Sequence, residues 1–169
     1  IFERTLTAAE RNRVQSYLGV KYGITLGVNG TSLDYFNSSN TNIKTQTNGY
    51  NFDVVGIGRD DRSGLSQLKS RSVNLIAGAT FGGQRRDIIT ISNGNNFGSP
   101  NNFAADNSFL MVGNDNGALN NGGAAPLSIL TDNGETIQAK MVRIWLTEET
   151  GTVGTVSIEA DFSNPAVGA

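Results

Sequence analysis

The sequence predicts an all-β protein, an antiparallel β-sandwich of the jelly-roll-like type with one short N-terminal α-helix. After residue 26, apolar and polar residues alternate in short runs, which is the pattern of half-buried strands. Asn-Gly pairs recur among these runs, and both residue types tolerate the positive φ angles of tight turns. Helical periodicity is confined to one segment near the N-terminus. Short strands separated by turn signals favour a sandwich over a parallel α/β sheet.

The helix is expected over residues 8–22. Thr7 and Glu10 have the spacing of a capping box, and Gly23 stands where a C-terminal cap is expected. At 100° per residue, one face of this helix gathers apolar side chains, namely Val14, Tyr17, Leu18 and Tyr22. The opposite face carries Arg13, Gln15 and Ser16. We therefore expect the apolar face to pack on the sandwich and the polar face to meet solvent.

Lys21 falls in the middle of this predicted apolar face. Because an unpaired buried ammonium group is costly, the side chain must extend to solvent or meet a carboxylate or carbonyl oxygen. A covalent Lys–Asn cross-link, of the kind found in surface adhesins, is a third alternative. The hypothesis is that Lys21 has a structural role and anchors the helix onto the sandwich.

The clearest strands are expected over residues 142–146 and 156–162, where one row is aliphatic and the other polar. Shorter strands are expected at residues 52–57, 72–77, 88–92, 109–112 and 127–130. The stretches 27–51, 92–107 and 114–125 are rich in Asn, Gly and Ser, which predicts surface loops.

Composition limits the chemistry that is available. The chain has 169 residues, enough for one domain with a core, and it contains no His and no Cys. This excludes Ser-His-Asp and Cys-His nucleophile sites, zinc bound by His or Cys, and disulfides. A metal would need oxygen ligands, as Ca²⁺ does, and no other cofactor is expected. The net charge of −2 disfavours nucleic acid as a partner, and no run approaches the ~18 apolar residues of a membrane span.

Several segments of the sequence resemble two known domain types. FERTLTAAER at 2–11 and VQSYLGVKYGITL at 14–26 resemble the end of a concanavalin A/laminin G-like domain. VGIGRDD at 55–61, SGL at 63–65, SRSV at 70–73 and FLMVGND at 109–115 resemble an uncharacterised β-sandwich module of large bacterial secreted and surface proteins. The resemblance implies residues 1–26 as the end of one domain and 27–169 as a module, which we expect to be truncated at its C-terminus. It implies a secreted or cell-surface location and neighbouring domains as partners, and it supplies no catalytic residues.

Three aspartates are candidate Ca²⁺ ligands. Asp60 and Asp61 lie in a glycine-flanked turn, which could direct both carboxylates at one cation, and Asp115 lies in another oxygen-rich turn. The alternative is structural: Arg59 and Arg62 form an ion-pair network with the neighbouring aspartates, and the Asp side chains make turn hydrogen bonds.

Trp145 is a candidate ligand contact, because an exposed indole can stack on a sugar ring. Strand alternation places it opposite the aliphatic row, on the outer face of the sandwich, where a loop or the helix covering it is the alternative. Glycoside hydrolysis would need two carboxyl groups about 5 to 9.5 Å apart in a cleft. The available acids are Asp60, Asp61, Glu148, Glu149, Glu159 and Asp161. Glu148 and Glu149 have the pattern of a solvated strand end.

These observations favour a non-catalytic structural or adhesive module of a large bacterial surface protein. The alternatives are a carbohydrate-binding module that uses loop Asn and Asp groups with or without Ca²⁺, part of a glycan-active enzyme, and the subunit of a surface filament. A glycan or a surface protein is the partner that these alternatives imply.

Overall fold

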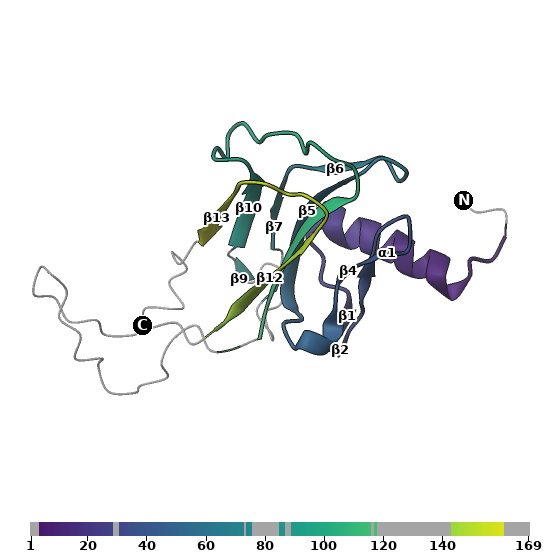
Figure 1. Cartoon of the computed structure of the whole chain (residues 1–169). Helices are drawn as coiled ribbons and strands as arrows, with labels where there is room; N and C mark the ends of the chain where they lie inside the picture. The colour runs from purple at the N-terminus through teal and green to yellow at the C-terminus, as the bar shows by residue number, and fades with distance from the viewer. Residues whose placement is uncertain are drawn as a thin grey trace, which may run out of the picture.

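The computed structural model describes residues 4–28, 31–72, 74–75, 85–86, 89–115, 117 and 143–160, and Figure 1 shows how they are arranged. The elements are α1 (Ala8–Tyr22), β1 (Gly27–Val28), β2 (Thr31–Ser32), β3 (Tyr35–Phe36), β4 (Asn42–Lys44), the 3-10 helix η1 (Gln46–Asn48), β5 (Phe52–Asp60), β6 (Leu65–Gln67), β7 (Lys69–Arg71), β8 (Asn74–Leu75), β9 (Arg85–Arg86), β10 (Ile89–Asn93), β11 (Ser108–Asn114), β12 (Trp145–Thr150) and β13 (Val156–Ala160). The prediction of an all-β fold with a short N-terminal helix is confirmed.

The strands form two main antiparallel sheets. One has the order β12-β11-β5-β6 and the other the order β13-β10-β7, while β1-β2, β3-β4 and β8-β9 are separate two-stranded pairs. In Figure 1 the three-stranded sheet lies on one side of the four-stranded sheet and α1 lies on the other. The architecture is therefore sandwich-like, with the four-stranded sheet as its middle layer. A jelly-roll connection of the strands stays a prediction.

The two central strands of the middle sheet, β5 and β11, are covered on both faces. One face of β5 and β11 meets the three-stranded sheet in a core made of Val55, Ile57, Ile89, Ile91, Phe103, Leu110, Val112 and Val153. The other face meets α1 and the β3–β4 hairpin in a second core made of Val20, Tyr35, Ile43, Val54, Leu65, Phe109 and Met111. Every residue of β11 is buried as a result, which explains why its residues 109–112 are all apolar rather than alternating.

Two glycines of β5 make room for large side chains of β11. Gly58 pairs with Phe109 and Gly56 pairs with Met111 across the strands. A Cβ atom at Gly58 would stand 2.3 Å from Phe109 Cδ1, and one at Gly56 would stand 2.3 Å from Met111 Sδ. The ring and the thioether therefore occupy the space that side chains at positions 56 and 58 would fill. The two glycines thus allow Phe109 and Met111 to pack in the second core.

The helix has the predicted bounds and caps, but the prediction of its buried face is wrong for Leu18 and Tyr22. The capping box of Thr7 and Glu10 is present, and Gly23 has the left-handed conformation expected of a helix C-terminal cap, with φ of 64°. The buried residues, however, are Ser16, Gly19 and Val20. Leu18 and Tyr22, expected in the core, are 42% and 57% exposed.

The reason lies in close contacts rather than in hydropathy. A Cβ atom at Gly19 would stand 2.9 Å from Tyr35 Cε1, so only glycine lets the helix approach this ring. Ser16 Oγ accepts a hydrogen bond from the backbone N–H of Phe36 at 2.9 Å and donates one to the carbonyl of Asn12 at 2.7 Å. Small residues thus bring the helix against the β3–β4 hairpin. Leu18 and Tyr22 turn away from the sheet as a result, while Tyr17 still packs against the edge of the second core.

Lys21 is exposed. Its Nζ donates a hydrogen bond to the hydroxyl of Tyr17 at 3.0 Å and stands 5.2 Å from the centre of the same ring. Tyr17 belongs to the same helix, so this contact does not join the helix to a sheet. The described contacts give the anchoring hypothesis no support.

Some of the predicted strands and loops are confirmed and others are wrong. Strands β5, β10, β11 and β13 overlap the predicted runs, and β12 begins three residues later than expected. The stretch 27–51, predicted as a loop, contains β1 to β4 and η1, so that prediction is wrong. The aliphatic row of β13 is not uniformly buried, because Ile158 is 48% exposed. The predicted strand at 127–130 lies outside the described residues.

We expect Gly58→Ala to lower the free energy of unfolding by about 1–3 kcal/mol, because the new methyl group overlaps the ring of Phe109 in a packed core. Chemical denaturation measures the change. Gly98→Ala is the matched control, since Gly98 is exposed and the closest atom to its Cβ position is Asn96 Oδ1 at 3.3 Å. The control should stay within about 0.5 kcal/mol. Equal effects at both positions would contradict this packing.

Candidate functional site

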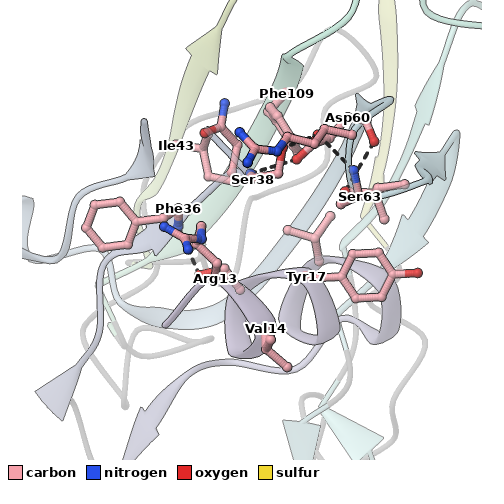
Figure 2. Close-up of a pocket in the computed structure, with 14 residues that line it drawn as sticks. Arg13, Val14, Tyr17, Phe36, Ser38, Ile43, Asp60, Ser63 and Phe109 are labelled. Carbon is pink, nitrogen blue, oxygen red and sulfur yellow. Dashed lines mark hydrogen bonds between the residues drawn. The ribbon is translucent and has the colours of Figure 1, made fainter. Parts of the chain in front are cut away.

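A cleft of about 330 Å³ opens between α1, the β3–β4 hairpin and the turn between β5 and β6. Its floor is formed by four buried apolar side chains, Val20, Ile43, Leu65 and Phe109. Figure 2 shows Asp60, Ser38 and Ser63 at one end of the cleft and Val14 and Tyr17 of α1 along the opposite wall. The cleft therefore joins an apolar floor to a polar end.

Asp60 is 2% exposed and forms the centre of the polar end. Its Oδ1 accepts hydrogen bonds from Ser38 Oγ at 2.6 Å and from the Ser63 N–H at 3.3 Å, and its Oδ2 accepts one from the Ser38 N–H at 2.8 Å. Burial acts to raise the pKa of this carboxyl, but the hydrogen bonds from Ser38 and Ser63 outweigh it, so the pKa is lowered. Asp60 thereby ties the β3–β4 hairpin to the β5–β6 turn.

Asp61 has a different orientation and different partners. It is exposed, and its two oxygens accept hydrogen bonds from Arg59 Nε at 2.7 Å and from an Arg59 terminal nitrogen at 2.8 Å, which lowers the pKa of the carboxyl. The other terminal nitrogen of Arg59 donates to the Phe103 carbonyl at 3.0 Å, and Asp106 Oδ1 accepts from the Asp61 N–H at 2.8 Å. Arg59 thus links the end of β5 to the segment before β11.

Asp115 accepts hydrogen bonds from the N–H groups of Gly117 at 2.9 Å and Ile144 at 3.0 Å, and these contacts lower its pKa. This is the turn-forming use of an aspartate. Within the described part of the chain, no group of three or more acidic side chains is placed so that it could hold a metal ion. The three candidate Ca²⁺ ligands lie in three separate hydrogen-bond networks, and calcium binding remains an untested prediction.

Trp145 packs against the core between the two sheets and is half-buried. The prediction that it lies on the outer face is wrong, because the register of β12 on β11 directs its side chain toward the three-stranded sheet. The indole Nε1 is buried and makes no hydrogen bond with the residues that the structure describes. The indole therefore serves mainly to pack against the core, and only the exposed part of the side chain could contact a ligand.

An ion pair between Lys44 and Glu148 is a feature that the sequence does not predict. Lys44 is 2% exposed, and its Nζ donates to Glu148 Oε1 at 2.9 Å. The same carboxylate accepts from the Asn48 side chain at 2.7 Å and the Thr45 N–H at 3.0 Å. Burial acts to raise the pKa of Glu148, but these hydrogen bonds lower it overall. The prediction that Glu148 is a solvated strand end is therefore wrong.

A second buried ion pair joins Asp53 to Arg143, with 2.9 Å between Asp53 Oδ2 and an Arg143 terminal nitrogen. Asp53 Oδ2 also accepts from the Asn114 amide at 2.6 Å, and Arg143 Nε donates to the Gly117 carbonyl at 2.9 Å. Asp53 has a φ of 52°, at the irregularity where β5 pairs with β11. This cluster holds the ends of β5 and β11 to the residues that precede β12.

The carboxylates share one chemical property. Each of Asp60, Asp61, Asp115 and Glu148 has a lowered pKa, so each stays ionised at neutral pH. A general acid needs the opposite shift, a raised pKa that keeps the proton in place. The arrangement suits the joining of chain segments better than proton transfer.

We expect Asp60→Asn to destabilise the protein by about 1–3 kcal/mol at pH 7, because the amide would direct an N–H donor at donors of Ser38 or Ser63. The lowered pKa of Asp60 means that its stabilising effect is fully present above its unfolded-state pKa and is lost as the pH falls through its folded-state pKa. The difference in the free energy of unfolding between wild type and variant should therefore become smaller below about pH 4. Denaturation curves from pH 7 to pH 3 measure it.

Asp61→Asn is the matched control for this experiment. Asp61 is adjacent in sequence but exposed, so its replacement should destabilise the protein less than the replacement of Asp60 does. The buried, hydrogen-bonded role of Asp60 would be contradicted by either of two results. One is a loss of unfolding free energy for Asp60→Asn that does not change with pH, and the other is a loss equal to that for Asp61→Asn.

Glu148→Gln should cost about 3–5 kcal/mol, because it leaves the buried ammonium of Lys44 without its carboxylate. Glu149→Gln controls for the loss of charge at the neighbouring exposed position, where the side chain accepts a hydrogen bond from the Val153 N–H at 3.0 Å. Thermal and chemical denaturation compare the two. If Glu148→Gln were as stable as Glu149→Gln, the ion pair between Lys44 and Glu148 would not contribute to stability as expected.

Comparisons with known proteins place the chain in a family. No curated protein and no solved structure matches it. No helix within the described ranges is long and apolar enough to cross a membrane. The family described as a domain of unknown function, DUF8202, matches residues 10–168, which includes most of α1 and both main sheets. The chain therefore belongs to the DUF8202 domain family.

Proposed function

We propose that this protein is a non-catalytic structural or adhesive module of a secreted or cell-surface bacterial protein, next to other domains of the same polypeptide. One observation carries the proposal: the buried acids are used to tie together segments that are distant in sequence. Glu148 of β12 holds Lys44 at a separation of 104 residues, and Asp60 holds Ser38 at a separation of 22. The secreted location rests on the resemblance of the sequence to surface modules.

These ties support a load-bearing role in a specific way. Antiparallel ladders resist separation because neighbouring strands share many hydrogen bonds, and the pairs of β11 with β5 and β12 are the longest among the described strands. The Lys44–Glu148 pair adds a link from the β3–β4 hairpin to β12, outside these ladders. A module built this way keeps its edges and loops in place while its ends are pulled.

The other candidate functions have less support. A glycan-active enzyme needs a proton donor, and the pKa values of the described acids named above are lowered. A sugar-stacking role for Trp145 competes with its packing in the core. A filament subunit is favoured by one feature, the exposed Ile158 on β13, which is an edge strand of its sheet.

Stretching the full chain between two handles in a single-molecule force experiment tests the proposal. We expect the chain to resist force cooperatively, and we expect Glu148→Gln to lower the unfolding force while Glu149→Gln leaves it unchanged, because only the first variant removes a link between distant segments. A chain that extends without a force peak would contradict the load-bearing role.

A panel of polysaccharides tests the non-catalytic part of the proposal separately. We expect no hydrolysis by the wild-type chain. Hydrolysis that Asp60→Asn abolishes and Asp61→Asn retains would overturn the proposal in favour of the enzyme alternative. Size measurements over a range of concentrations test the filament alternative, which predicts growth with concentration.

A further inference from the structure

We propose that the cleft between α1 and the β5–β6 turn is a binding site for a small organic anion, a carboxylate attached to an aromatic or branched aliphatic body. This inference goes beyond the structural role proposed above and does not depend on it. It rests on three observations. The floor of the cleft is apolar, the polar groups of its lining other than arginine already have hydrogen-bond partners within the protein, and two arginines belong to the lining.

The shape and lining of the cleft fit an apolar body of modest size. Its volume of about 330 Å³ lies at the lower end of the range for small-molecule pockets. Val20 and Phe109 form part of the floor, and the half-buried rings of Tyr17 and Phe36 form part of the walls. A ring or branched chain placed here would cover apolar surface that now meets water, which is the main source of affinity in such pockets.

The polar groups that line the cleft already have partners within the protein. Asp60 accepts from Ser38 and Ser63, as described above. Ser16 bonds to Phe36 and to the backbone of its own helix. The Asn37 amide donates to Asn107 at 2.9 Å, and its oxygen accepts from two backbone N–H groups. A sugar, whose hydroxyls need both donors and acceptors, would find few free groups here.

The free hydrogen-bonding capacity belongs to the two arginines. Neither Arg13 nor Arg62 lies in an ion pair with a described residue. Arg13 makes one hydrogen bond at the limit of acceptable length, 3.5 Å to Asn40 Oδ1, and Arg62 is exposed. Guanidinium groups only donate, so the ligand must supply acceptors. With Asp60 counted at −1, the cleft lining keeps a net charge of +1, which favours an anion.

The probe that tests this is 3-phenylpropionate, with 3-phenylpropionamide as its neutral counterpart of nearly the same shape. Titration is followed by ¹H–¹⁵N correlation spectra of the full chain and by calorimetry. We expect saturable binding of the carboxylate at micromolar to millimolar concentrations, with shifts at residues 13–20, 36–38 and 60–65. The amide should bind about tenfold more weakly, since it forfeits the charge-assisted hydrogen bonds.

Two variants assign the effect to the cleft. Arg62→Gln removes one guanidinium from the lining and should weaken carboxylate binding by about fivefold to tenfold, with no change in amide binding. Arg71→Gln removes an exposed arginine of β7 that does not line the cleft, so it should change neither affinity. Correlation spectra verify that both variants are folded.

Three results would overturn the inference. They are equal affinity for carboxylate and amide, equal weakening by Arg62→Gln and Arg71→Gln, and the absence of shifts at the cleft residues. None of them bears on the unfolding force or on hydrolysis, so a failure here is distinguishable from a failure of the structural role.

Discussion

The burial of β5 and β11 on both faces is the constraint on which the rest of the structure depends. A strand pair covered on one side only would leave either the three-stranded sheet or the helix without a surface to pack on. Because side chains alternate along a strand, Leu110 and Val112 serve one core while Phe109 and Met111 serve the other. The two cores therefore share a backbone, and a change in one strand pair affects both.

The glycines of β5 follow from this constraint. The middle sheet carries two large side chains of its own on the helix side, Phe109 and Met111, and Gly56 and Gly58 leave the space that these side chains occupy. The helix in turn approaches through Ser16 and Gly19, which bring it close to Tyr35. Small residues thus set the distances between layers. The buried ion pairs then hold the hairpins and strand ends around the finished core, with each charge bonded so that its burial is tolerated.

Local signals in the sequence were sufficient for local structure. The Thr7–Glu10 capping box and Gly23 place the helix to the residue, because caps depend on neighbours within one turn. The buried face of the helix could not be found this way. Hydropathy favours Leu18 and Tyr22, but the fit of Gly19 against Tyr35 decides the orientation, and that contact involves a residue of the β3–β4 hairpin. The partnership of Lys44 with Glu148 is equally non-local, so the sequence around Glu148 gives no sign of it. Of the candidate site, the sequence identifies Asp60 only as a candidate Ca²⁺ ligand or turn-forming residue, because the cleft around it is formed by three elements that are separate in sequence.

Native-state hydrogen exchange tests the central claim most directly, since it measures the free energy at which each amide opens. If β5 and β11 form the shared backbone of both cores, the amides of residues 55–58 and 109–112 should exchange only through global unfolding. Their opening free energies should equal the value from chemical denaturation, and the amides of edge strand β13 should open at lower free energy. Opening of residues 109–112 at the same low free energy as β13 would contradict the account.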